Sequence, residues 1–396
     1  MAAQSSPLDF TTTKDYYNRA KVLFFMGYEK NPMTLVTAVT ILQYWNPSGP
    51  EHVSIHNSSY WLRVGVGLVH QIGLHRDPKP DCSDRHLRRR IFWTLYARDS
   101  LLSAGQGRPR AIHLEDCNVD WPSVADFSSA DKSTHAFVAY VKIAGLLGDL
   151  AQWFLRGSAD AEQQRLAFFD RLCAWAGGLP EELHIVNTAG EYSRYDGTVR
   201  SLYLPYLMAV MMLYRPKQIL HSFSEATMTS TIAASCVARI FEDALARGEV
   251  RDGVAMSAIY LLIAGIFKVG SLSHPLLRLS TLEELRIIAM SLTELAKTWQ
   301  TATGSLEILQ RLRAKFEATS SPPEACPLRV KVSDKILFEP FGPSFSPILK
   351  LLDQVETQPL VQRSSDNPVK GGEIVFRPQD QLPNPTQPLP SNTCWT

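Results

Sequence analysis

A helical spacing of apolar residues, sustained from about residue 34 to residue 315, limits the possible folds more than any other feature of this sequence. In the clearest stretch Trp61, Gly65, Leu68 and Ile72 follow one another at intervals of three or four residues, so they share one helix face. Few stretches alternate strictly between apolar and polar residues, as the strands of a half-exposed sheet do. The sequence therefore predicts an all-α fold built as one large multi-helix domain.

The periodicity and the turn residues together predict where the clearest helices lie. Pro50 and Glu51 suit the first turn of one helix, and Gly73 suits its end. Asp84 is a suitable N-cap for the next helix, which should stop before Gly105 and Gly107. The expected helices cover residues 32–44, 50–74, 84–104, 132–155, 161–176, 199–220, 224–246, 254–270, 282–301 and 305–316.

The composition changes after Phe316. Serines and prolines follow, then a short apolar island at 336–352, and from 358 onward prolines and glutamines are frequent. Segments of this composition bury too little apolar surface to offset the entropy lost on folding. We therefore expect a domain over residues 1–355, with its helical core at 34–316, and a disordered Pro/Gln-rich tail over residues 356–396.

Charge and cysteine content limit the classes of protein to which this chain can belong. Forty Lys and Arg residues balance 39 Asp and Glu residues, which argues against binding nucleic acid through overall charge. The polar start, without an apolar run, predicts no signal peptide, and the long uncharged runs fall short of the ~20 residues that span a bilayer. The six cysteines include no CxxC pair, so no local zinc cluster is expected and a reducing compartment is favoured.

The helix over 84–104 contains a charged pair that should be buried. On a helical wheel that starts at Leu87, Arg98 falls at about 20°, inside the apolar stripe, and Asp99 borders it. A buried guanidinium without a partner is costly, so Arg98 should contact a carboxylate or several carbonyl groups. A structural ion-pair network is favoured over a ligand-binding role.

The neighbouring run Arg88, Arg89 and Arg90 resembles a nucleic-acid patch only in the linear sequence. On the same wheel the three fall at about 100°, 200° and 300°, so one nucleic-acid backbone could not meet them all. Solvated or capping charge is favoured, with Arg89 on the far side from the core. A nuclear import signal over 85–90 is the alternative.

Other candidate sites are weaker. His52 and His56 have the spacing of two zinc ligands but lack a third, so a polar helix face is favoured. No GxSxG, phosphate loop or GxGxxG appears, and no enzyme is expected, although a dispersed carboxylate pair stays open. Six residues of one helix could line a ligand cavity but are more typical of a core. They are Tyr203, Tyr206, Met208, Met211, Met212 and Tyr214.

Residues 60–122 carry ordered motifs: YWLRVGVGLVHQIGLHRDP, then RHLRRRIFWTLYARDSLLSAGQGRP, then IHLEDCNVDWP. This stretch resembles the middle-homology, fungus-specific regulatory domain of the Zn2Cys6 zinc-cluster transcription factors, within them the cutinase-transcription-factor type. The likeness is specific over about 65 residues and looser to about residue 315. The resemblance implies structural or regulatory roles for Gly73, His75, Arg76, Asp77, Arg89, Trp93, Arg98, Asp99, Gly107, Arg108 and Pro109.

The resemblance implies a transcriptional regulator in a fungal nucleus that controls a specialised-metabolite or catabolic gene set through an effector or a partner. In this family a six-cysteine, two-zinc module normally precedes the regulatory domain and binds zinc and DNA. None of the cysteines here has its C-x2-C-x6-C spacing, so the implied zinc cofactor is absent from this chain. DNA would be reached indirectly or through an N-terminal zinc cluster.

Several partners and functions stay open. Homodimers, heterodimers with other transcription factors, and a small-molecule effector are all compatible with the resemblance, whereas a membrane partner is not expected. One alternative function is a co-regulator without a zinc cluster that acts through a full-length partner. Another is a small-molecule-binding protein or enzyme that has recruited this fold.

Overall fold

A computed structural model describes residues 10–46, 54–157, 161–216, 225–319 and 330–357. Across these residues the chain forms twelve α-helices and five short 3-10 helices, and a single bridge between Val186 and Tyr192 is the only β-type pairing. The predicted all-α class is confirmed. The tail predicted for 356–396 lies outside the described residues from 358 onward.

The helices follow the expected order along the chain. The α-helices are α1 (Phe10–Phe25), α2 (Pro32–Leu42), α3 (Ser58–Ile72), α4 (Arg85–Gln106), α5 (Lys132–Arg156), α6 (Ala161–Gly177), α7 (Gly197–Leu213), α8 (Glu225–Arg247), α9 (Met256–Ser271), α10 (Arg278–Ala296), α11 (Gln300–Thr319) and α12 (Pro347–Thr357). The 3-10 helices are η1 (Leu114–Asp116), η2 (Val124–Asp126), η3 (Glu181–Leu183), η4 (Glu249–Asp252) and η5 (Val332–Phe341).

The break that was expected at 302–304 lies at 297–299 instead, between α10 and α11. Two other predicted boundaries differ from the structure for local reasons. The helix expected over 50–74 begins at Ser58, because the Asn57 side chain accepts the backbone N–H of Tyr60 at 2.8 Å and caps the helix there. The helix expected over 199–220 ends at Leu213, ahead of Pro216, which cannot continue a helix. Helix α1 is an addition that the sequence pattern did not predict.

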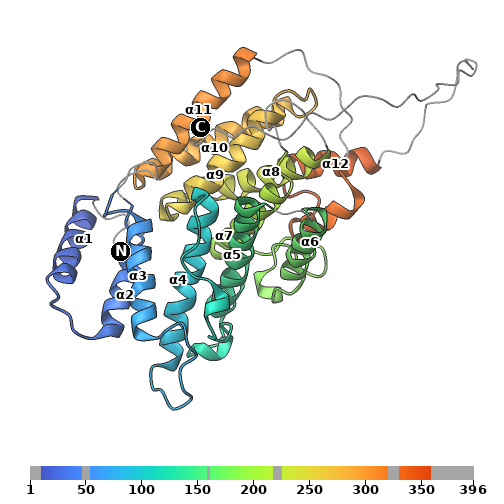
Figure 1. Cartoon of the computed structure of the whole chain (residues 1–396). Helices are drawn as coiled ribbons and strands as arrows, with labels where there is room; N and C mark the ends of the chain where they lie inside the picture. The colour runs from blue at the N-terminus through green and yellow to red at the C-terminus, as the bar shows by residue number, and fades with distance from the viewer. Residues whose placement is uncertain (1–9, 47–53, 158–160, 217–224, 320–329, 358–396) are drawn as a thin grey trace, which may run out of the picture.

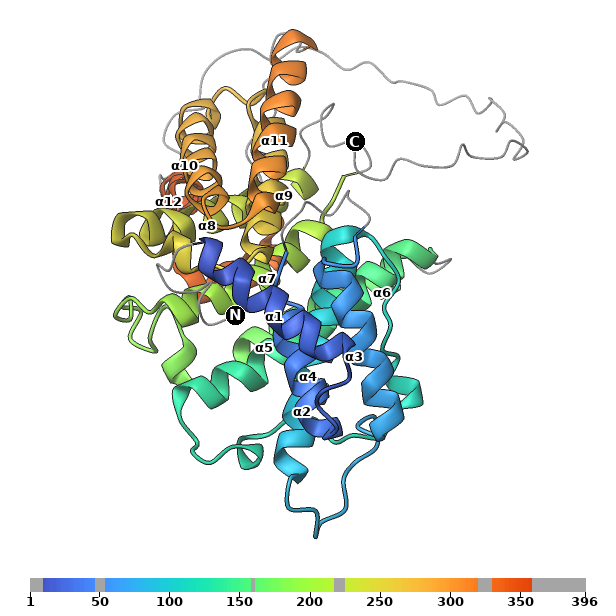
Figure 2. The ribbon, with the colours of Figure 1, turned by 90° about the vertical axis from the view of Figure 1, so that its left-hand side faces the viewer.

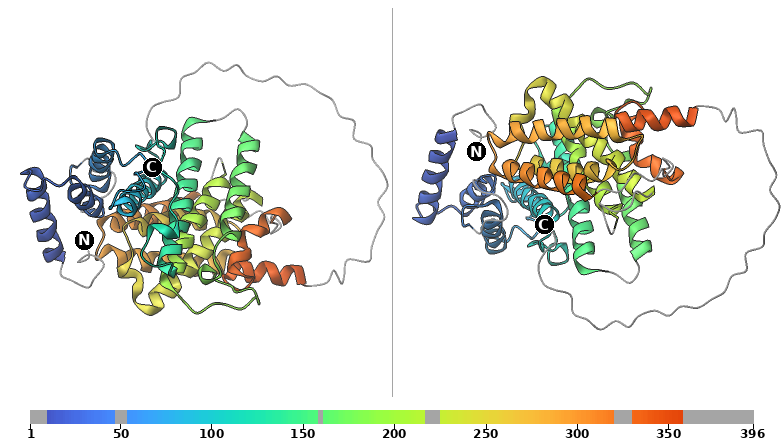
Figure 3. Two further views of the ribbon diagram at one scale, coloured as in Figure 1. Left: turned by 90° about the horizontal axis from the view of Figure 1, so that it is seen from below. Right: turned by 90° about the horizontal axis from the view of Figure 1, so that it is seen from above.

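One continuous apolar core, with members from Val36 to Ile348, joins both halves of the chain. Helices α2 and α3 lie at one end and α9, α10 and α11 at the other, with α4 and α5 between them (Figure 1, Figure 2). A smaller cluster around Trp45 and Trp61 attaches α1 through Tyr17. Figure 3 shows α1 and α12 at opposite sides of the molecule.

Among the described residues, α5 is the one helix with the length and apolar character that crossing a membrane requires, and 61% of its most apolar window is buried inside the structure. This is weak evidence for a membrane span, since the core helix of a folded domain has the same properties. Helices α7 and α9, which contain the two long uncharged runs, are also largely buried.

Helices α4 and α5 approach closely where α5 carries Gly148. A Cβ at this position would lie 2.7 Å from the Ser100 Cβ and 3.0 Å from its Cα. We expect Gly148→Ala to lower the free energy of unfolding by about 1–3 kcal/mol, because the backbone of α4 would have to move. Gly67→Ala is the control: Gly67 is exposed in α3, meets nothing within 4 Å, and should gain about 0.5–1 kcal/mol from helix propensity. Urea unfolding of both variants measures the difference, and equal effects would contradict this packing.

Candidate functional site

The family-like motifs meet around Arg89 of α4, which is buried with 7% of its surface exposed. Its Nε and Nη2 donate to the two carboxylate oxygens of Asp77, at 2.8 and 2.7 Å. Nη2 also donates to Asp120 at 2.8 Å, and Nη1 lies 3.5 Å from Asp126. Arg89 thus ties the turn after α3 to α4 and to the loop that follows it.

The prediction that Arg89 is solvated on the far side from the core is wrong. The wheel considers only the packing of α4 itself, whereas the segment with Asp120 and Asp126 folds over the opposite face. Arg88 does form the expected capping-type pair, with Asp84 at 2.7 Å. Arg90 donates to the backbone carbonyl of Asp126. Because all three arginines have partners within the domain, the run does not form a free basic patch for DNA.

The charge of Arg89 favours the ionised form of Asp77. Burial by itself would raise the pKa of Asp77, but the hydrogen bonds and charge of Arg89 lower it overall. Trp93 adds a hydrogen bond between uncharged groups: its indole N–H donates to the Asp120 backbone carbonyl at 2.9 Å. The Trp93 ring also stacks on Trp121. The motif residues therefore hold one loop to one helix.

The remaining motif residues shape turns and helix ends. Gly73 and Gly107 close α3 and α4 with φ values of 78° and 61°, a conformation that favours glycine. The carbonyls of His75 and Arg108 accept hydrogen bonds from Asn118 and Ser103. The Pro109 carbonyl accepts a hydrogen bond from Arg63. Arg76 is exposed.

Asp99 and Arg98 are both buried, as expected, but they do not pair with each other. One Asp99 oxygen accepts the backbone N–H groups of Ala111 and Ile112, at 2.7 and 2.8 Å, and burial raises the pKa of this carboxyl group. Arg98 donates to the Ser58 hydroxyl at 3.1 Å and lies over the ring of Tyr44. The predicted carboxylate or set of carbonyls around Arg98 is not what the structure contains.

The helix face expected for His52 and His56 can be checked only at His56, which does not lie in a helix. His52 lies outside the described residues, and His56 precedes α3, where its Nδ1 lies 3.2 Å from the Tyr17 hydroxyl. No group of three or more His, Cys, Asp or Glu side chains suited to a metal occurs in the part of the chain that the structure describes. The absence of a zinc cofactor from this chain stays a prediction.

The aromatic and methionine residues of α7 are core, as the sequence favoured. Tyr203, Tyr206, Met208 and Met211 are fully buried, and Met212 packs against the same core. The Tyr206 hydroxyl donates to the Leu337 carbonyl at 2.8 Å, which attaches η5 to α7. These side chains do not line the pocket between α5, α7, α8 and η4.

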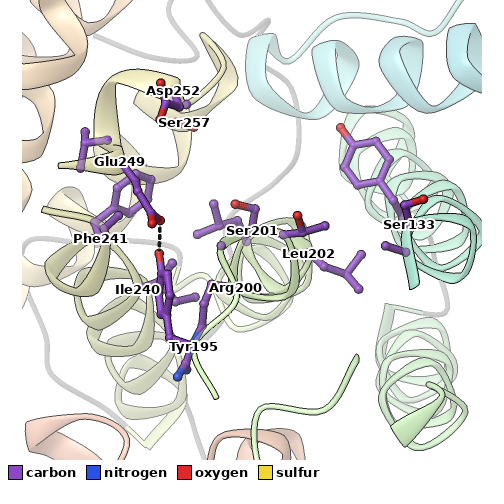
Figure 4. Close-up of a pocket in the computed structure, with 18 of the residues that line it drawn as sticks. Ser133, Tyr195, Arg200, Ser201, Leu202, Ile240, Phe241, Glu249, Asp252 and Ser257 are labelled. Carbon is purple, nitrogen blue, oxygen red and sulfur yellow. Dashed lines mark hydrogen bonds between the residues drawn. The ribbon is translucent and has the colours of Figure 1, made fainter. Parts of the chain in front are cut away.

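That pocket lies between α5, α7, α8 and η4, with a volume of about 640 Å³ (Figure 4). This volume falls within the usual range of small-molecule sites. Its lining is mostly apolar, with polar groups at a few points. The lining residues include Ala136, Tyr195, Arg200, Ile240, Ala244 and Glu249.

Local sequence positions the polar groups of this pocket. Asp196 caps α7 by accepting the N–H groups of Thr198 and Val199, so Arg200 follows in the first turn. The Tyr195 hydroxyl donates to Glu249 at 2.7 Å (Figure 4), and burial together with this bond raises the pKa of Tyr195. The ring of Tyr195 is covered by the guanidinium of Arg247, 3.7 Å from the ring centre.

Arg200 is the under-paired charge of the pocket. It is 9% exposed, the closest carboxylate oxygen, on Asp243, is 4.0 Å away, and its Nη1 is buried without an acceptor. Its guanidinium stacks on Phe345 at 4.8 Å, and burial lowers the pKa of Arg200. An apolar pocket with one under-paired guanidinium and a carboxylate suits the binding of a small polar organic molecule. The sequence pattern did not predict this site, although Arg200 bounds a long apolar run.

The known proteins to which this chain is similar are regulators from fungi. Residues 1–174 match the fungal specific transcription factor domain. The acetamidase regulatory protein of Emericella nidulans is 27% identical over 333 residues, which is 78% of this chain and 40% of that protein. The protein of the same name from Aspergillus fumigatus is 27% identical over 312 residues, 74% of this chain and 39% of the relative.

A shorter match is to a second group of regulators. Cutinase transcription factor 1 alpha of Fusarium vanettenii is 32% identical over 147 residues, 34% of this chain and 16% of that protein. The chain spans about 40% of the length of the acetamidase regulators. No solved structure matches the chain. The resemblance inferred from the motifs of residues 60–122 is confirmed.

Proposed function

We propose that this chain, which carries a fungal specific transcription factor domain over residues 1–174, regulates transcription in a fungal nucleus. The observation that carries the proposal is the length of the match to named regulatory proteins. An alignment of 333 residues necessarily extends past residue 174, so the likeness includes helices beyond the domain itself. The chain acts by binding rather than by catalysis.

The pocket next to Arg200 supplies a means of response. A small effector that fills it would contact α5, α7 and α8 together and so stabilise one arrangement of these helices. The gene set is a catabolic one, because acetamidase regulators match over most of the chain, whereas a cutinase regulator matches over about a third of it. A specialised-metabolite gene set is the second possibility.

A second candidate function is that of a co-regulator that acts through a full-length partner. None of the six cysteines has the C-x2-C-x6-C spacing of a zinc cluster. Such a chain would form homodimers or heterodimers with other transcription factors and reach DNA through them.

Both versions predict that the purified chain binds DNA weakly and without sequence preference. The arginines at 88–90 are engaged within the domain and the net charge is only +1, so few phosphate contacts are available. We expect dissociation constants of roughly 10⁻⁶ M or weaker at physiological salt. Fluorescence titration with promoter DNA measures this, and a site-specific complex tighter than ~10⁻⁸ M would contradict it.

The pocket is tested by filling it. In the fungal host, Ala244, which is half-buried on the pocket wall, is replaced by tryptophan. The control is Ala174→Trp, because Ala174 is exposed on α6. We expect Ala244→Trp to change the transcripts that deletion of the gene changes, because the effector is excluded, and Ala174→Trp to leave them at wild-type levels. Transcript profiling measures both, and thermal unfolding verifies that both variants fold. A folded Ala244→Trp variant with normal transcripts would rule out the pocket as the effector site.

A further inference from the structure

Arg98 is a buried cation for which the described part of the chain provides no anion. Its side chain is 5% exposed, and none of the ion pairs formed by the described residues includes it. Its contacts are the hydrogen bond to Ser58 and the face of the Tyr44 ring, 5.0 Å from the guanidinium carbon. Its Nε is buried without any acceptor. Since a guanidinium stays protonated in proteins, the charge remains, and a neutral hydroxyl and a ring compensate it only in part.

A small cavity adjoins this charge. It has a volume of about 20 Å³ and lies where α4 meets α9 and α11. Arg98, Leu102, Gly105 and Gln106 line it from α4, and Asn46 from the end of the α2 segment. The opposite wall consists of Ala255, Met256, Ile259 and Thr301.

The size of the cavity decides what it can hold. About 10–15 Å³ accommodates one water molecule, so 20 Å³ takes one guest of that order and excludes a carboxylate-bearing organic effector. The Thr301 hydroxyl accepts from the Asn46 amide at 2.8 Å, which leaves its own hydrogen to donate. Arg98 Nε and the Thr301 hydroxyl are thus two donors next to a positive charge, an arrangement that suits an anion better than water.

We propose that this cavity binds a monatomic halide, chloride under ordinary conditions. The ion accepts from Arg98 Nε and from the Thr301 hydroxyl, and it neutralises the guanidinium. Because Arg98 belongs to the family-matching residues 1–174 and Thr301 to α11, the ion joins that domain to the C-terminal helices.

Halide-dependent stability tests the proposal. The full chain is unfolded thermally in sodium chloride and in sodium gluconate, at equal ionic strength, over a series of concentrations. A ligand bound only to the folded state stabilises that state, so the wild-type protein should melt a few degrees higher in chloride than in gluconate. This increase should level off at high chloride concentration, and bromide should have the same effect. Arg98→Met should show no difference between chloride and gluconate. Arg110→Met is the matched control, since Arg110 already pairs with Asp149 at 2.6 Å, and it should keep the wild-type chloride response.

Three outcomes would overturn the proposal. One is a wild-type melting temperature that is the same in chloride and gluconate, which would mean that water fills the cavity. The second is a chloride response that survives in Arg98→Met. If Arg98→Met does not fold, Thr301→Val takes its place: it should shift the chloride midpoint to higher concentration, and an unchanged midpoint would be the third.

Discussion

Arg89→Met should lower the free energy of unfolding by about 3–5 kcal/mol, because it leaves buried carboxylates without their cation. Asp126 is 1% exposed and Asp77 about a quarter exposed, so neither is fully compensated by water. Arg88→Met is the control: its side chain is 26% exposed and pairs only within the first turn of α4, so its loss should cost about 0.5 kcal/mol or less. Urea unfolding at pH 7 compares them. Equal effects would show that the Arg89 network contributes little.

The same network predicts a dependence on pH. The pKa of Asp77 is lower in the folded chain than in the unfolded chain, so its pairing adds stability above the unfolded value of about 3.9. This contribution is lost as the pH falls through the folded pKa. The difference in stability between wild type and Arg89→Met should therefore shrink below about pH 4. A difference that stays constant down to pH 3 would contradict this assignment.

The second large effect is expected at the buried pair Lys268 and Glu284. Their side chains are 0% and 3% exposed, and Lys268 Nζ lies 2.6 Å from Glu284 Oε2. The two side chains form an ion pair, and Ser235 supplies a hydrogen bond to the other carboxylate oxygen. Burial lowers the pKa of Lys268. The pair links α9 to α10 inside the apolar core.

Removing one partner of the Lys268–Glu284 pair should lower the free energy of unfolding far more than removing both. Glu284→Ala is expected to lower the free energy of unfolding by about 3–5 kcal/mol, because Lys268 is left buried and unpaired. The double variant Lys268→Met, Glu284→Leu should lie within about 1 kcal/mol of wild type or above it, since both desolvation penalties disappear. Chemical unfolding of the single and double variants completes the cycle. A double variant as unstable as Glu284→Ala would mean that shape, and not charge, governs this position.

The contrast between Arg98 and Arg89 shows how far the sequence could predict the structure. Helical periodicity reports which face of α4 packs on the core, and it placed Arg98 correctly among buried side chains. It contains no information about a loop that returns to the opposite face, which is how Arg89 became buried. The Asp77 and Asp120 carboxylates were visible in the motifs, and Asp126 follows just after them, but their convergence on one guanidinium depends on tertiary structure.

Helix positions were predictable for a related reason. Caps and breakers act locally, so α4 and α5 were expected close to their observed bounds, whereas α1 has several exposed apolar side chains, including Phe25 at 54%, and gives no clear face. The pocket was not predictable, because Ala136, Arg200 and Ala244 come from three helices.

The most direct test of the central claim is a tethered reporter measurement in fungal cells. The chain is fused to a DNA-binding module of known site, and expression of a reporter carrying that site is compared with the module alone. We expect a nuclear fusion protein that changes reporter expression several-fold, with the change altered by Ala244→Trp and retained by Ala174→Trp. A stable nuclear fusion that leaves the reporter at the level of the module alone would contradict it.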